Sequence, residues 1–96
     1  MLVVIAYDIS LEDENGTKRL RKISKLCVDY GQRVQNSVYE CNLNSSELAV
    51  LKNKILKIMD LNSDSLKIYK LGNNYKNRIE HYGSKKSYDA NDALIV

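Results

Sequence analysis

The chain has 96 residues, 44% hydrophobic and 28% charged, which suits one small domain with one core and argues against wholesale disorder. Its formal net charge of +3 is mildly basic and is weak evidence of an anionic partner. Cys27 and Cys41 are the only cysteines and His81 the only histidine, which excludes a four-ligand Cys/His zinc site within one chain. We expect both thiols to be packed and reduced.

Residues 2–10 read LVVIAYDIS, and residues 2–9 form a short apolar, β-branched run that predicts a buried strand with the carboxylate of Asp8 near its end. An aspartate there often starts a turn, because its side chain accepts backbone N–H groups from the next residues. A functional carboxylate is the alternative interpretation. The polar loop 10–16 follows, with Glu12, Asp13 and Glu14 close in sequence to Asp8 and Gly16 as a breaker.

A first helix is predicted to begin at Thr17 or Asn15 and to end at Gly31. Its apolar face recurs at spacings of three and four and comprises Leu20, Ile23, Cys27 and Tyr30. Basic side chains occupy the rest of the helix, and Arg33 begins the next element. A solvated helix face is the ordinary meaning of such a run, but the basic excess favours nucleic acid, bound through phosphate contacts that select no sequence. The residues concerned are Lys18, Arg19, Arg21, Lys22, Lys25 and Arg33.

The next segment, 33–43, is a strand candidate whose apolar residues do not alternate cleanly, so a bulge is one option. Asn44 and Glu47 have N-cap and N3 character and open a second helix. Its expected apolar face is Leu48, Leu51, Ile55, Ile58 and Met59. Strands are expected at 65–71, more weakly at 76–82, and at 92–96, where the short apolar run needs a sheet edge that a partner could supply.

Read as one strand, 33–43 gives the order β-α-β-α-β-β. The ferredoxin-like order β-α-β-β-α-β needs two hairpinned strands there instead, and the patterning leaves the choice open. No apolar run reaches the roughly 18–20 residues of a membrane span. Residues 1–9 lack the features of a signal peptide, so we expect a cytoplasmic protein with no membrane association.

Four segments carry a family resemblance. The chain has YDI at 7–9, RVQNSVYEC at 33–41, LNSSEL at 43–48 and RIEHYG at 78–83, ahead of a short apolar tail. Together they resemble the small CRISPR-associated spacer-acquisition proteins, the second Cas protein, long described as endoribonucleases. The resemblance implies one α+β domain over 1–96 with the ferredoxin-like order β-α-β-β-α-β. It also implies a homodimer in which an arm or strand within 83–96 completes the partner's sheet.

The same resemblance implies a function. Family members are dimeric subunits of the CRISPR adaptation complex that bind double-stranded DNA and bridge copies of the integrase subunit. Endonuclease activity on RNA or DNA is described for some members, so whether this chain is an enzyme stays open. A stand-alone endoribonuclease toxin of similar fold is the alternative.

The enzymatic interpretation centres on Asp8 as both catalytic residue and metal ligand. One carboxylate is a poor site for Mg²⁺, or for Mn²⁺, but two symmetry-related Asp8 side chains could complete one with water and phosphate. Such a carboxylate pair predicts activity that climbs with pH. Glu12, Asp13 and Glu14 are rival ligands or solvated loop residues. The resemblance places Tyr7, Asn36 and Ser37 in the dimer cleft. Tyr7 points away from Asp8 in a regular strand, and packing in the core is its alternative. For Asn36 and Ser37 the alternative is that they are polar residues on the exposed face of a strand.

Overall fold

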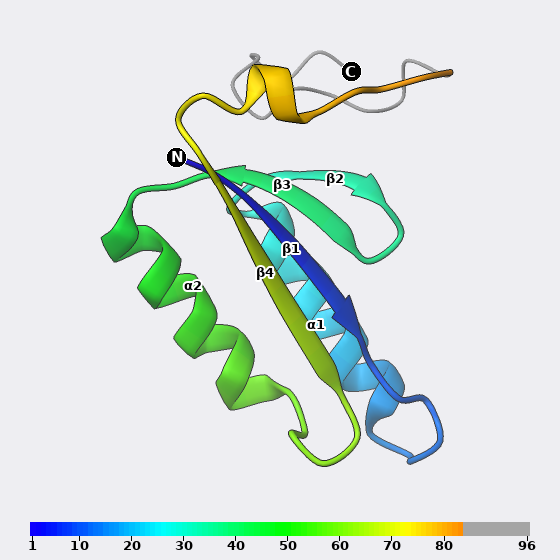
Figure 1. Ribbon diagram of the computed structural model, residues 1–96. Coiled ribbons are helices and arrows are strands. Elements are labelled where there is room, and N and C mark those ends of the chain that lie inside the picture. The colour runs from blue at the N-terminus through cyan, green and yellow to red at the C-terminus, as the bar shows by residue number, and fades with distance from the viewer. Residues whose placement is uncertain (84–96) are drawn as a thin grey trace.

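The computed structural model describes residues 1–83. Its elements are β1 (Leu2–Asp8), α1 (Gly16–Val28), β2 (Gln32–Gln35), β3 (Val38–Asn42), α2 (Ser45–Ile58), β4 (Ser65–Gly72) and a 3₁₀ turn, η1 (Lys76–Arg78) (Figure 1). The strands form one antiparallel sheet in the order β2-β3-β1-β4. This β-α-β-β-α-β arrangement confirms the predicted ferredoxin-like fold. The arm over 83–96 and the strand at 92–96 lie, apart from Gly83, outside the described residues.

The segment 33–43, for which the patterning left one strand or two hairpinned strands open, forms a hairpin of β2 and β3. The chain turns at Asn36 and Ser37, residue types that favour turns, and β2 folds back on β3. The ladder shifts register between Arg33 and Gln35. This irregularity explains why the apolar residues do not alternate cleanly along the segment.

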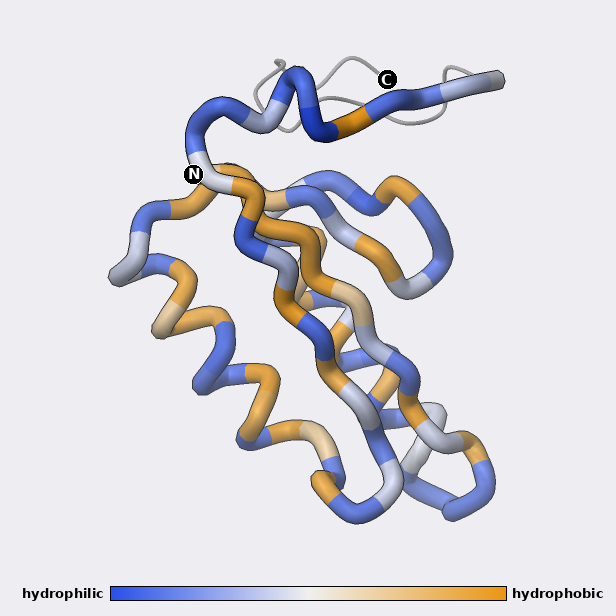
Figure 2. Tube along the Cα trace, viewed as in Figure 1, coloured by the Kyte–Doolittle hydropathy of each residue, from blue (hydrophilic) through white to orange (hydrophobic). Residues whose placement is uncertain are grey.

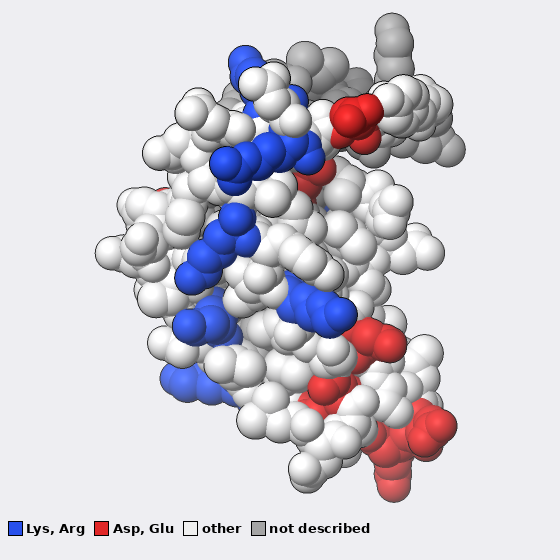
Figure 3. All heavy atoms as spheres, viewed as in Figure 1, with Lys and Arg blue, Asp and Glu red and all other residues white. Residues whose placement is uncertain are grey.

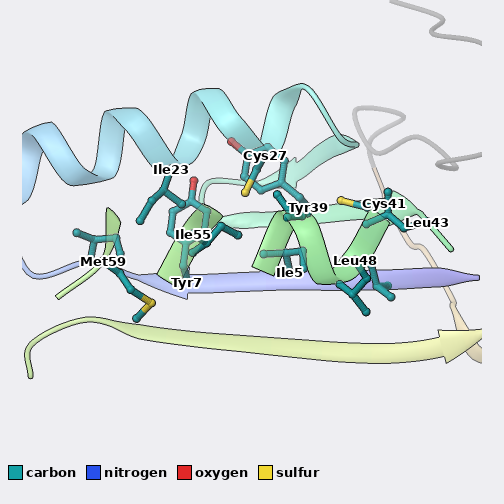
Figure 4. Packing of buried hydrophobic residues seen from close by; sticks show 13 residues of the cluster. Ile5, Tyr7, Ile23, Cys27, Tyr39, Cys41, Leu43, Leu48, Ile55 and Met59 are labelled. Carbon is teal, nitrogen blue, oxygen red and sulfur yellow. The ribbon is translucent and has the colours of Figure 1, made fainter. Parts of the chain in front are cut away.

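Alternation along β1 divides the molecule into a core side and an open side. Val3, Ile5 and Tyr7 are buried beneath the helices, whereas Val4 and Ala6 are half-buried on the opposite face of the sheet. The apolar residues of α1 and α2 pack onto the first set, as Figure 4 shows from close by. The hydropathy pattern agrees, with hydrophobic residues concentrated along the central strands and the inner sides of the helices (Figure 2).

Both helices follow the predicted patterns. Ile23 and Cys27 of α1 are fully buried, and α1 begins at Gly16, directly after Asn15. The capping box at the start of α2 is present, because the Glu47 N–H donates to the Asn44 side chain at 2.8 Å and the Asn44 N–H donates to Glu47 at 2.9 Å. These two bonds fix where α2 starts.

The strand predicted at 76–82 is wrong. Gly72, with φ at 76°, turns the chain away from the sheet, and residues 76–78 form the 3₁₀ turn η1 instead. The Arg78 N–H donates to the Tyr75 carbonyl at 2.8 Å. A segment with alternating polar and apolar residues forms a strand only where it can pair with the edge of a sheet. This segment has turned away from the edge formed by β4, so among residues 1–83 it has no strand to pair with. Within the described residues, no helix is long and apolar enough to cross a membrane.

Candidate functional site

Asp8 is the last residue of β1 and lies exposed on the face of the sheet that the helices leave uncovered. It is paired in register with Ser65 at the start of β4, and Lys67 is paired with Ala6. A hollow of about 260 Å³ is lined by Ala6, Tyr7, Asp8, Ser65 and Lys67. A carboxylate, a hydroxyl and an ammonium group therefore share one depression at the end of the central strand.

A metal ion would find a suitable but incomplete donor set here. Carboxylate oxygen is the ligand that Mg²⁺ and Mn²⁺ prefer, and the exposed Asp8 supplies one. Within residues 1–83, no group of three or more His, Cys, Asp or Glu side chains could hold a metal ion. The donor chemistry fits, but the described part of one chain supplies too few ligands.

Tyr7 lies on the core side, so its side chain does not reach the open face beside Asp8. Its hydroxyl is 2.7 Å from Ser24 Oγ, and its ring stacks on Tyr39 with centroids 6.0 Å apart. Burial raises the pKa of the phenol well above its ordinary value. Tyr7 therefore packs in the core, which is the alternative interpretation, and supports β1 from the side of the sheet that the helices cover.

Asn36 and Ser37 form the turn of the β2–β3 hairpin. The Tyr7 N–H donates to the Ser37 carbonyl at 3.1 Å, which ties this turn to β1 one residue before Asp8. Asn36 is exposed and Ser37 is half-buried. The structure thus brings both predicted cleft residues to the end of β1 that carries Asp8.

The loop after β1 is held by a carboxylate that sequence reasoning missed. Asp64, in the α2–β4 loop, has its side chain fully buried and accepts hydrogen bonds from the backbone of Ser10 at 2.9 Å and Asp60 at 2.8 Å. It also accepts from Arg19 Nε at 2.8 Å and Nη2 at 3.2 Å. Burial by itself would raise the pKa of Asp64, but these hydrogen bonds outweigh burial and hold the pKa below its ordinary value.

Arg19 also binds Asp13, with 3.0 Å from Nη1 to Oδ1 and 3.0 Å from Nη2 to Oδ2. The hydrogen bonds from Arg19 lower the pKa of Asp13. With its side chain only 12% exposed, Arg19 is committed to the loop and offers little to a phosphate. Asp13 is exposed like Glu12 and Glu14, but its pairing with Arg19 sets it apart from them as a rival ligand.

The other predicted nucleic-acid residues are exposed. Lys18 and Lys22 face the groove between the helices, where Lys57 of α2 joins them. Arg21 lies elsewhere on α1 and Arg33 on β2. In Figure 3, viewed as in Figure 1, basic side chains extend along the upper and left parts of the molecule, and acidic ones gather at the lower right, near the end of β1 and its loop.

Comparison with known proteins gives a consistent result. Residues 1–79 match the family model described as CRISPR associated protein Cas2. The chain is 54% identical over 95 residues, 99% of each chain, to the CRISPR-associated endonuclease Cas2 of Halalkalibacterium halodurans. It is 50% identical to the CRISPR-associated endoribonuclease Cas2 of Nitratidesulfovibrio vulgaris, over 100% of this chain and 94% of that one.

A solved structure agrees with these sequence relatives. The crystal structure of Streptococcus pyogenes Cas2 at pH 6.5 superimposes with a TM-score of 0.75 at 47% identity, covering 86% of this chain and 100% of that one. The range matched by the family model includes the strand that carries Asp8 and both helices. The chain therefore belongs to the Cas2 family of CRISPR-associated proteins.

Proposed function

We propose that this protein acts as a homodimer that carries double-stranded DNA and bridges integrase subunits during spacer acquisition, with a metal-dependent endonuclease centre at Asp8. The observation that carries the proposal is the position of Asp8, exposed beside Ser65 and Lys67 on the uncovered sheet face. A relative named as an endonuclease and another named as an endoribonuclease support phosphodiester hydrolysis as the reaction.

The uncovered sheet face supports the homodimer. Val4, Ala6 and Val38 are half-buried on it, and Tyr69 on β4 is 50% exposed. Packing this face against a second copy would remove apolar surface from water. Because Asp8 ends the central strand of the same face, a two-fold axis through it would bring two Asp8 carboxylates toward each other.

Two facing carboxylates would hold Mg²⁺ or Mn²⁺ together with water and substrate phosphate. The bound ion would polarise the phosphoryl oxygen and ready a water molecule for attack. Lys67 would attract the phosphate into the hollow, and the Ser65 hydroxyl would donate a hydrogen bond to it.

The exposed cations Lys18, Arg21, Lys22 and Arg33 would bind the nucleic-acid backbone. Arg19 is left out because two carboxylates already hold its guanidinium. Such contacts select no sequence, which suits a protein that carries DNA of any origin. Membership of the Cas2 family favours this role over a stand-alone toxin of similar fold.

A cleavage and binding assay on the purified protein tests the proposal. Wild type, Asp8→Ala and the control Asp29→Ala, which removes another exposed carboxylate, are compared on labelled RNA and double-stranded DNA with Mg²⁺, Mn²⁺ or chelator. We expect metal-dependent cutting that is lost only in Asp8→Ala, with salt-sensitive binding retained by all three. Cutting by Asp8→Ala would remove Asp8 from the centre. If all three proteins bind but none of them cuts, only the role as a DNA-carrying bridge would remain, without the nuclease centre.

A further inference from the structure

A groove runs between α1 and α2, on the helical side of the molecule and away from the sheet face that carries Asp8. Two adjoining hollows of about 290 and 460 Å³ form it, and they share Lys22, Lys57 and Ile58. The larger hollow lies toward the end of α1, between Leu26 and α2. The proposed nuclease centre uses no part of this groove. Lys18 and Lys22 on its wall are also among the cations proposed to bind nucleic acid, so an occupant of the groove would compete with nucleic acid for them.

The walls of the larger hollow are cationic on both sides. α1 contributes Lys22 and Lys25, and α2 contributes Lys54 and Lys57, whereas Asp29 is the one acid among the described residues that line it. Within residues 1–83, none of these four lysines forms an ion pair with a carboxylate. Four unneutralised charges on facing walls repel one another, so an anionic occupant would be stabilised.

One of these cations is already held in position. Lys54 Nζ donates to the Tyr30 hydroxyl at 3.1 Å and lies 5.5 Å from the centre of the tyrosine ring. A lysine fixed in this way loses less side-chain freedom when it binds an anion. The ammonium group of Lys54 is therefore preorganised at the α2 wall.

The floor of the groove is aliphatic. Leu26 and Ile58 are half-buried between the two rows of lysines, whose methylene stems extend the apolar surface. A phosphate backbone would use the lysines but would gain nothing from this floor. A peptide that places an apolar side chain on Leu26 and Ile58 and carboxylates on the lysines would use both features.

We propose that the groove between α1 and α2 binds an acidic segment of a partner protein, one that carries one or two apolar side chains flanked by carboxylates. A short amphipathic helix meets this description, because apolar residues three or four apart lie on one face with acids on either side. The occupant would leave Asp8 and the open sheet face free.

Fluorescence anisotropy with synthetic probes tests this inference on the full chain. The probes are fluorescein-labelled helical peptides with leucines three or four residues apart and glutamates beside them, in both sequence directions. Matched peptides replace the leucines with serine, or the glutamates with lysine. The protein variants are the double substitution Lys25→Glu/Lys57→Glu, one from each wall, and the control Lys52→Glu, an exposed lysine of α2 outside the groove.

We expect at least one leucine–glutamate peptide to bind wild type, and the double variant to bind it at least about tenfold more weakly. Loss of the leucines should weaken binding at least about tenfold, and Lys52→Glu should bind within about twofold of wild type. Circular dichroism checks that each variant is folded.

Three results would overturn the inference. The first is that no peptide of the series binds wild type. The second is that the serine peptide binds as tightly as the leucine peptide, which would reduce the groove to a general anion surface. The third is that Lys25→Glu/Lys57→Glu weakens binding of duplex DNA more than binding of the peptide, which would assign the groove to nucleic acid.

Discussion

Replacing Asp64 with asparagine should destabilise the fold by about 3 kcal/mol. The buried carboxylate accepts four hydrogen bonds, two from backbone N–H groups of Ser10 and Asp60 and two from Arg19. Asparagine keeps the size of the side chain but turns one acceptor into a donor, so the groups facing that donor lose their partner. Breaking a buried ion pair costs about 3–5 kcal/mol, and a buried N–H without an acceptor costs about 1–3 kcal/mol.

The expected loss lies at the lower end of the range for a buried ion pair, about 3 kcal/mol. The reason is that Arg19 keeps its contacts with Asp13 and its side chain is still 12% exposed. A loss of about 3 kcal/mol is a large share of the roughly 5–15 kcal/mol that stabilises a small domain. At about 4–8 °C per kcal/mol for a domain of this size, Tm should fall by about 12–24 °C.

Urea unfolding followed by circular dichroism measures the effect. The matched control is Asp13→Asn, which alters the other carboxylate on the same guanidinium, but one whose side chain is 43% exposed. Solvent screens that pair, so its loss should be much smaller. Equal destabilisation by the two substitutions would refute the assignment of Asp64 as the buried anchor of the loop after β1.

Three further outcomes follow from the packing. A methyl group at Gly16 would overlap the carbonyl oxygen of Ser10. Gly16→Ala should therefore lower the free energy of unfolding by about 1–3 kcal/mol in the same urea assay. An unchanged unfolding midpoint would contradict this close approach. The lowered pKa of Asp64 means that its stabilising effect is present above its unfolded pKa of about 4 and is lost as pH falls through the folded value. The free energy of unfolding of wild type should therefore fall more steeply between pH 5 and pH 2 than that of Asp64→Asn. Parallel plots of the free energy of unfolding against pH would contradict this role of Asp64. Burial raises the pKa of Cys27 to about 12 and that of Cys41 to about 11. A thiol reagent at pH 8 should therefore modify both cysteines only after the protein unfolds. Rapid labelling of the native protein would show instead that the two thiols are accessible.

Part of the candidate site could be predicted from the sequence. Alternation along β1 places Asp8 and Tyr7 on opposite faces, and the structure finds Asp8 exposed and Tyr7 in the core. The partners of Asp8 in its hollow, Ser65 and Lys67, could not be predicted. They come from β4, and only the register between two strands distant in sequence decides which residues stand beside Asp8.

The sequence by itself determined the local elements of this protein. The β-branched run of β1, the spacing of apolar residues in α1, and the Asn44–Glu47 capping box each depend on neighbours a few residues away, and each was predicted. Local patterns carry this information because strand and helix periodicities are short.

Only the tertiary structure decided which distant segments meet. Arg19 looked like one more cation on a basic helix, but the fold brings it to Asp64, 45 residues away, and makes it a structural residue. Residues 76–82 had a strand-like pattern, but β4 ends at Gly72 and the chain turns away from the sheet. A buried ion pair or a strand needs a partner in space, and the spacing of residues along one segment does not contain that partner.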